Sequence, residues 1–305
     1  MAFITLASND SYALGALVWA ASLRRVGTTK DIAILVTNGV SDSLRNVLPK
    51  FFNHIELVNV LESPDPSILE ALKRPELNIT LTKLHCWKLT QYSKCVFMDA
   101  DTLVVKNIDE LFEKEELSAV SDIGWPDCFN SGVFVFVPSQ QTFANLTSLA
   151  AKEGGSFDGG DQGLLNTYFS DWATRDINRH LSFIYNMQFA SCSYSYAPAF
   201  KRFGDKVKVI HFLGSVKPWH YTGSEHANEF IKKWWSMYFS EVHPKIESLS
   251  DVGSLSSTIQ SMSIQAAADE SSVVDDRSAS SANWQGQNVP FEVIQKKLDA
   301  SIQKP

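Results

Sequence analysis

The sequence lacks the features that mark membrane proteins and nucleic-acid-binding proteins. Its 305 residues contain no apolar run near the roughly 20 residues that span a bilayer, so a membrane segment is not expected. No long run of lysine and arginine is present and the net charge is −7, so nucleic acid is not an expected partner. No basic segment precedes the first apolar stretch, and we expect no signal peptide.

Cysteine is also scarce. Four cysteines are spread along the chain without a close pair, and Cys86 and Cys95 lie inside apolar segments. This usage is typical of reduced thiols, and we expect a cytosolic protein.

The sequence does contain short apolar runs that alternate with helical patterns. Runs at residues 3–6, 31–37 and 55–60 predict strands, with one helix from about residue 11 and another over residues 41–52. Such alternation indicates an α/β fold with a mainly parallel sheet. Ligands of these folds bind beyond the carboxyl ends of the strands, where the strand order reverses. Ser8 and Asn9, directly after the first strand, are therefore expected to line a crevice.

Two acids follow a later apolar run in the same way. Residues 95–98 predict a buried strand, after which come Asp99 and Asp101. Carboxylates at the end of a buried strand are costly unless their charge is compensated. Mg²⁺ or Mn²⁺ would compensate it and would share its coordination with substrate phosphates, whereas the alternative is a turn with two solvated aspartates. His211, at the end of a predicted strand over residues 207–211, is either a third ligand or a satisfied core histidine.

Other polar residues have two possible interpretations each. Lys83 lies near the start of a predicted helix over residues 81–92, where it is either a phosphate ligand or a surface charge, and Arg74 has the same alternatives. The glycine-rich segment 154–163 carries Asp158 and Asp161 and precedes a helix predicted over residues 162–169. It is either an acidic surface loop or a loop that contacts a polar substrate. A loop at residues 124–132 leads into an apolar strand predicted over 133–137.

The composition changes after residue 247. We expect a catalytic domain over residues 1–247, a flexible linker over 248–283 and a docking peptide over 284–305. Phe291, Ile294 and Leu298 form one apolar stripe of a short predicted helix, and Trp284 precedes it. A helix without a core of its own favours docking in a partner's groove, and the alternative is a disordered tail.

Six segments carry a resemblance to one enzyme family. They are Arg-Pro-Glu-Leu at residues 74–77, Leu-Thr-Lys-Leu-His-Cys-Trp at 81–87, Phe-Met-Asp-Ala-Asp-Thr-Leu at 97–103, Gly-Trp-Pro-Asp-Cys-Phe-Asn-Ser-Gly-Val-Phe at 124–134, Phe-Asp-Gly-Gly-Asp-Gln-Gly at 157–163, and His-Phe-Leu-Gly with Val-Lys-Pro-Trp over 211–219. Together they resemble the glycogenin family, retaining glycosyltransferases of family 8 that glucosylate themselves to prime glycogen synthesis. The resemblance covers residues 3 to about 235 and resumes in the C-terminal peptide.

The resemblance implies the roles of particular residues. Asp99, Asp101 and His211 match manganese ligands, with magnesium as the alternative ion, and Tyr194 matches the tyrosine that accepts glucose. Catalytic roles are implied for Asp161, Asp158 and Lys83. Contacts to the donor UDP-glucose are implied for Leu6, Ser8, Asn9, Tyr12, Arg74, Lys83, Asp99, Ala100, Asp101, Asn130, Ser131, Asp158, Asp161, Gln162, His211, Gly214 and Lys217.

The resemblance also implies an architecture and partners. We expect a single Rossmann-like domain of the GT-A type, with a mixed, mainly parallel sheet. A cytoplasmic homodimer on glycogen particles is implied, with glycogen synthase docked on the C-terminal peptide and a growing glucan chain as later acceptor. Asp161 is either a nucleophile or a residue that orients glucose during attack on the same face. Two other functions stay open: an inactive scaffold that recruits a synthase, and a transferase with a separate acceptor.

Overall fold

The computed structural model describes residues 1–63, 69–70, 75–189, 197–214, 216–221 and 229–247. Arg74, Tyr194, the predicted linker and the predicted docking peptide lie outside the described residues. None of the helices in the described part has the length and apolar character that a bilayer crossing requires.

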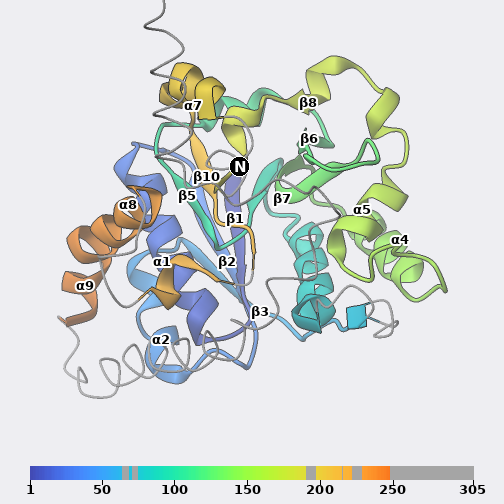
Figure 1. Ribbon diagram of the computed structural model, residues 1–305. Helices are drawn as coiled ribbons and strands as arrows, with labels where there is room; N and C mark the ends of the chain where they lie inside the picture. The colour runs from blue at the N-terminus through green and yellow to red at the C-terminus, as the bar shows by residue number, and fades with distance from the viewer. Residues whose placement is uncertain (64–68, 71–74, 190–196, 215, 222–228, 248–305) are drawn as a thin grey trace, which may run out of the picture. The chain divides into compact units, whose positions relative to one another are not determined.

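A seven-stranded mixed sheet forms the centre of the fold (Figure 1). Its strand order is β3-β2-β1-β4-β7-β6-β8. The strands are β1 Ala2–Ala7, β2 Asp31–Val36, β3 His54–Leu57, β4 Cys95–Met98, β6 Ser118–Ser121, β7 Phe129–Phe136 and β8 His180–Leu181. All neighbours pair in parallel except β7, which is antiparallel to both β4 and β6. The predicted α/β fold with a mixed, mainly parallel sheet is confirmed, and the order reverses between β1 and β4 as the crevice requires.

A second sheet of three strands brings the late part of the chain to β4. Its order is β5-β10-β9, with β5 at Thr102–Val104, β10 at Val209–His211 and β9 at Met187–Gln188. β10 pairs antiparallel with β5, and His211 lies opposite Thr102 in the register. Since β5 follows β4 after a short turn, this pairing places His211 beside the two acids, Asp99 and Asp101, that follow β4.

Helices cover both faces of the large sheet. The α-helices are α1 Asp10–Arg25, α2 Asp42–Arg45, α4 Gln140–Ala150, α5 Asp161–Tyr168, α7 Ala197–Phe203, α8 Glu229–Met237 and α9 His243–Glu247. The 3-10 helices are η1 Leu48–Lys50, η2 Pro75–Lys88, η3 Asp109–Glu113, η4 Trp172–Thr174, η5 Ile177–Arg179, η6 Phe183–Tyr185, η7 Gly204–Lys206 and η8 Pro218–His220, and η9 Tyr238–Val242 is a π-helix. Figure 1 shows α1, α8 and α9 on one side of the sheet and α4 and α5 on the other.

The sheet separates two apolar clusters. Phe3 of β1 faces the cluster that includes Trp19 and Trp234, whereas its neighbour Ile4 faces the opposite cluster. The second cluster contains the stacked rings of Trp87, Phe97 and Phe134. The alternation follows from the two-residue period of a strand. Apolar side chains therefore cover both faces of the sheet, and a polar ligand is expected to bind at the strand ends.

Two predicted helices differ from those observed. The helix predicted over residues 41–52 is wrong in extent: α2 starts after the N-cap Ser41 but ends at Arg45, and η1 follows with Pro49 inside it. Proline has no N–H and crowds the preceding turn, which interrupts the α-helix. The helix predicted over 81–92 is the 3-10 helix η2, which starts earlier and ends at Lys88. Apolar residues three apart share a face in both helix types, so the spacing predicted the burial but not the type.

Several strand and helix ends are also shifted. β7 begins at Phe129 rather than residue 133, so the polar segment Asn130 to Gly132 belongs to a buried strand. β3 ends at Leu57 rather than residue 60, and β10 begins at Val209 rather than residue 207. α5 spans Asp161–Tyr168, one residue earlier than predicted. The strands differ from prediction because strand pairing, not local apolarity, sets where a strand ends.

Candidate active site

The candidate site is a crevice of about 690 Å³ at the carboxyl ends of β1 and β4. It brings together most of the residues singled out in the sequence. Its lining includes Leu6, Ser8, Asn9, Tyr12, Lys83, Asp99, Ala100, Asp101, Asn130, Ser131, Asp158, Asp161, Gln162, His211, Gly214 and Lys217. It also includes Thr80, Asp122 and His220, which the sequence did not single out.

The turn after β4 presents the first two acids. The amide of Asp99 donates to the carbonyl of Gly132 (2.9 Å), and the amide of Thr102 donates to the carbonyl of Asp99 (3.1 Å). The Thr102 hydroxyl donates to the same carbonyl at 2.8 Å. The amide of Phe212 donates to the carbonyl of Asp101 at 2.9 Å, which ties β10 to this turn. One ligand atom from each of Asp99, Asp101 and His211 lies within 4.8 Å of the others.

The His211 ring shows why this cluster suits a metal ion. The side chain is 1% exposed, and its Nδ1 lies 2.8 Å from Oδ1 of Asn186. Nε2 is buried and makes no hydrogen bond with any described residue. It lies 3.2 Å from Oδ1 of Asp101 and 3.9 Å from Oδ2 of Asp99. An imidazole nitrogen aimed at two carboxylates without a hydrogen bond fits a divalent cation bound between them. The residues present therefore fit the predicted metal site.

Lys217 compensates one of the acids. Its Nζ lies 2.5 Å from Oδ2 of Asp101 and donates to the carbonyl of Phe212 at 3.1 Å. Burial lowers the pKa of Lys217, but Asp101 outweighs burial and the pKa lies above its ordinary value. Burial likewise opposes ionisation of Asp101, but Lys217 and His211 hold its pKa below the ordinary value. The pair is therefore ionised on both sides at neutral pH.

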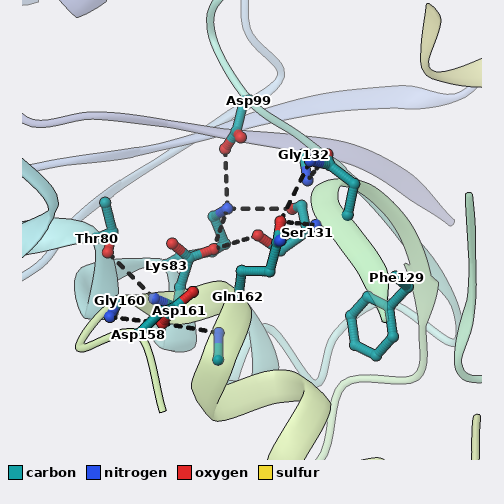
Figure 2. A network of polar contacts seen from close by, with 12 residues as sticks. Thr80, Lys83, Asp99, Phe129, Ser131, Gly132, Asp158, Gly160, Asp161 and Gln162 are labelled. Carbon is teal, nitrogen blue, oxygen red and sulfur yellow. Dashed lines mark hydrogen bonds and ion pairs between the residues drawn. The ribbon is translucent and has the colours of Figure 1, made fainter. Parts of the chain in front are cut away.

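Lys83 occupies the middle of the crevice (Figure 2). Its Nζ lies 2.5 Å from Oδ2 of Asp161 and 3.0 Å from Oδ1 of Asp99, and it donates to the carbonyl of Ser131 at 3.1 Å. The residue is 4% exposed, so the alternative of a surface lysine is wrong. Burial lowers the pKa of Lys83, but Asp161 and then Asp99 raise it above its ordinary value. Burial raises the pKa of Asp99 even though Lys83 opposes the shift.

Asp161 is held from three directions. Its Oδ2 accepts from Lys83 and, at 2.7 Å, from the Ser131 hydroxyl. Its amide donates to the Thr80 hydroxyl at 3.2 Å, as Figure 2 shows. Its Oδ1 takes no hydrogen bond from the described residues, since the ion pair and both side-chain donors meet Oδ2. One oxygen of a fixed carboxylate thus stays available to a ligand.

Asp158 has contacts of a different kind. Its Oδ1 accepts from the Ser156 hydroxyl and from the amides of Gly160 and Gly163, at 2.9, 2.9 and 3.0 Å. A Cβ at Gly163 would lie 2.3 Å from this oxygen, so glycine is needed there. These bonds order the loop and cover the start of α5. A catalytic role of Asp158 stays a prediction.

The comparisons with known proteins agree with this geometry. Residues 3–223 match the model of a family described as glycosyl transferase family 8. Glycogenin-1 of Mus musculus is 55% identical over 81% of this chain and 78% of its own length, and Glycogenin-1 of Homo sapiens is 55% identical over 81% and 74%. The chain belongs to the glycogenins of glycosyl transferase family 8. It is therefore a retaining glycosyltransferase, a glycogenin glucosyltransferase, as the resemblance implied.

A solved structure supports the fold of this glycogenin. The glycosyltransferase GlyE of Streptococcus pneumoniae TIGR4 matches with a TM-score of 0.54 and 19% identity, over 81% of this chain and 63% of that chain. Together with the family match, this likeness confirms the predicted GT-A type of architecture. Of the cysteines, Cys86, Cys95 and Cys128 are described, and all three are free thiols.

Proposed function

We propose that this glycogenin transfers glucose from UDP-glucose to its own Tyr194 and then extends that glucose into an α-1,4-linked primer. One observation carries the proposal: two carboxylates and the unbonded Nε2 of His211 converge beside two buried lysines at the strand ends. A nucleotide diphosphate sugar fits such a site, since its phosphates share a metal ion and meet lysine charge.

Asp99, Asp101 and His211 are the residues that would hold Mn²⁺, with Mg²⁺ as the alternative. A bound ion supplies Lewis-acid stabilisation of the charge that grows on the departing diphosphate. The local charge supports this assignment. Among the charges that pair with one another, three carboxylates (Asp99, Asp101, Asp161) meet two lysines (Lys83, Lys217), a net charge of 2 − 3 = −1 that a divalent ion changes to +1. The departing diphosphate then meets a metal ion and two ammonium groups.

Other residues of the crevice are proposed to bind the two ends of the donor. The nucleotide end is assigned to residues at the tip of β1, to the β4 turn and to the segment after β10. These residues are Leu6, Ser8, Asn9, Tyr12, Ala100, Gly214 and Lys217, together with Arg74 outside the described residues. The glucose end is assigned to Asn130, Ser131, Asp158, Asp161 and Gln162.

Asp161 takes part in the transfer by one of two routes. In the first route its free Oδ1 attacks C1 as the bond to the diphosphate breaks. The acceptor hydroxyl then displaces the carboxylate and passes its proton to a phosphate oxygen of the departed diphosphate. In the second route Asp161 only orients glucose, and the acceptor attacks from the side that the diphosphate leaves, passing its proton to a phosphate oxygen. A glucosyl adduct on Asp161, trapped and located by mass spectrometry, supports the first route. Both routes retain the configuration at C1.

Intact-mass spectrometry of the full chain tests the proposed function. After incubation with UDP-glucose and Mn²⁺, the protein should gain successive hexose increments. Tyr194→Phe should gain none, while its transfer of glucose to an added maltoside survives. An unchanged mass in the wild type would contradict self-glucosylation and favour a scaffold or a separate acceptor, and hexose on Tyr196 in the variant would contradict the assigned acceptor.

The assignments of partners rest on the family and on the C-terminal sequence. Glycogen synthase is proposed to bind residues 284–305 through Trp284, Phe291, Ile294 and Leu298. A homodimer, the growing glucan chain and a cytoplasmic location on glycogen particles belong to the same proposal. Removal of residues 284–305 should abolish co-purification with the synthase and leave self-glucosylation intact.

A further inference from the structure

Asn186 lies directly behind the His211 ring, on the side opposite the crevice acids. It is 1% exposed and occupies the bend between η6 and β9. β9 pairs in parallel with β10, which places Asn186 beside the strand that ends in His211. The side chain bonds to only two groups among the described residues. Its Oδ1 lies 2.8 Å from Nδ1 of His211, and its Nδ2 donates to Oδ1 of Asn130 at 2.8 Å.

The orientation of Asn130 is fixed by two groups whose hydrogen-bonding roles cannot change. The amide of Gly132 is always a donor, and it lies 3.0 Å from Oδ1 of Asn130. The carboxylate of Asp122 is an acceptor, and it lies 2.9 Å from Nδ2 of Asn130. Gln162 adds a second acceptor on that side at 3.2 Å. The oxygen of Asn130 must therefore face Gly132 and Asn186, and the nitrogen must face Asp122.

The same reasoning continues through Asn186 to the histidine. Because Asn130 offers an oxygen, Asn186 must offer its nitrogen there, and its oxygen then faces His211. A carbonyl oxygen only accepts, so Nδ1 of the neutral imidazole carries the proton and Nε2 carries the lone pair. Nε2 is the nitrogen that faces Asp99 and Asp101 and that has no hydrogen bond among the described residues.

We propose that Asn186 is a positioning residue that holds His211 with its proton on Nδ1, so that Nε2 is always ready to bind the metal ion. The carboxylates alone favour the opposite tautomer, since a proton on Nε2 would be attracted by Oδ1 of Asp101, 3.2 Å from that nitrogen. That proton would remove the lone pair. Groups that orient a metal-binding histidine from behind typically change metal affinity about 10–100-fold when they are lost.

The arrangement also joins the two ends of the crevice. Asn130 and Gln162 belong to the part of the crevice assigned to glucose, and Asn186 connects Asn130 to the metal ligand. This inference rests on the proposed function only for the identity of the ion and of the sugar. The tautomer of His211 is a property of the metal-free protein, and it can be measured without Mn²⁺ or UDP-glucose.

Long-range ¹H–¹⁵N NMR of histidine-labelled, metal-free full chain reports the tautomer directly, at a pH well above the ordinary histidine pKa of about 6.5. His211→Gln identifies the signal. The wild type should show the proton on Nδ1, and Asn186→Ala should show it on Nε2. Asn186→Asp in its protonated form keeps an acceptor behind the ring and a donor toward Oδ1 of Asn130, and should restore the Nδ1 proton. An Nδ1 proton in Asn186→Ala would overturn the proposal.

Mn²⁺ binding, followed by electron paramagnetic resonance, supplies the second measurement. Asn186→Ala should weaken binding about 10–100-fold relative to the wild type. Asn166→Ala is the matched control, because Asn166 also ties down β7, through the amide and carbonyl of Phe129 at 2.9 Å each. Its other described side-chain hydrogen bond goes to the carbonyl of Gln162, and none joins it to His211 or Asn130 among the described residues. Equal weakening in both variants would overturn the role of Asn186. A wild type that binds no Mn²⁺ would contradict the proposed ion and leave the tautomer measurement to decide the inference.

Discussion

The two halves of the crevice satisfy their charges differently. Around Lys83, the carboxylate of Asp161 receives an ammonium and a hydroxyl, and both bonds lie within the described protein. Around Asp101, one carboxylate oxygen pairs with Lys217, but the other faces Nε2 of His211, which makes no hydrogen bond within the part of the chain that the structure describes. In the first half Asp161 is paired with a protein cation and keeps only its Oδ1 open to a ligand, whereas the second half lacks a cation between its carboxylates and the histidine. The comparison distinguishes residues that shape the site, around Lys83, from residues that are expected to bind a metal ion, around Asp101.

Asp101→Asn should have the largest effect on the second half. The change keeps the volume but removes the charge that binds both Lys217 and the metal ion. Glucosyl transfer should fall by at least about 1000-fold, the scale on which charge stabilisation of a leaving group acts. The initial rate of hexose incorporation, measured with saturating Mn²⁺ and UDP-glucose, checks this prediction.

Asp176→Asn is a suitable control for that change. Asp176 is an exposed aspartate whose side chain, among the described residues, accepts hydrogen bonds only from Asn178, so its amide variant should keep full activity. Circular dichroism should show that both variants are folded. Activity of the wild type that persists in excess chelator would contradict the assignment of a metal ion to this half.

In the first half, a substitution of Lys83 should lower the free energy of unfolding. Lys83→Met leaves the buried Asp161 and the half-buried Asp99 without their common cation, and an uncompensated buried charge costs about 3–5 kcal/mol. Urea unfolding of the metal-free protein measures this loss. Lys88→Met is the matched control on the same helix, since Lys88 is exposed and has no described ion pair. A similar loss in both variants would mean that the Lys83 ion pairs add no stability.

The sequence predicted one half better than the other. Asp99 and Asp101 follow an apolar run directly, and the end of a parallel strand is where ligands bind, so a local pattern was sufficient. The bond from Thr80 to Asp161 joins residues 81 positions apart, across η2 and α5. Asn186 lies in a bend beside a two-residue strand, and its role depends on the pairing of β9 with β10. Neither contact has a periodic pattern that could reveal it.

β7 illustrates the same limit. Asn130 and Ser131 near its start are polar, and local apolarity predicted a loop up to residue 132. Phe129 pairs with Ser121 of β6, and β4 pairs with the strand from Val133 onward, so the polar residues between them are part of a buried strand. The hydrogen-bond partners of Asn130 lie inside the site. Polar residues in a buried strand indicate a functional site only when their hydrogen-bond partners are known. The partners of Asn130, which include Asp122 and Asn186, lie in other segments of the chain, so the local sequence does not reveal them.

Gly132→Ala tests whether the second half depends on the exact position of His211. A Cβ at this glycine would lie 2.2 Å from Cε1 of the ring, so the ring or β7 must move. We expect Mn²⁺ binding to weaken about 10–100-fold and stability to fall by about 1–3 kcal/mol. Gly124→Ala is the control, since its nearest neighbour would lie at an ordinary 3.6 Å. Unchanged Mn²⁺ affinity in Gly132→Ala would show that the ring position is not critical.

Ser131→Ala should have the smallest effect and tests the completeness of the first half. It removes the hydroxyl that donates to Asp161 at 2.7 Å, while Lys83 still pairs with the same oxygen. A hydrogen bond to a charged group contributes about 1.5–3 kcal/mol, and the remaining ammonium should keep the loss near the lower end. We expect transfer to slow about 10-fold with the Kd of Mn²⁺ unchanged, because the serine does not reach the metal ligands. Ser121→Ala, at an exposed position of β6, should change neither quantity. A large change in the Kd of Mn²⁺ for Ser131→Ala would show that the two halves act as one unit, with Lys83 transmitting the loss from Asp161 to Asp99.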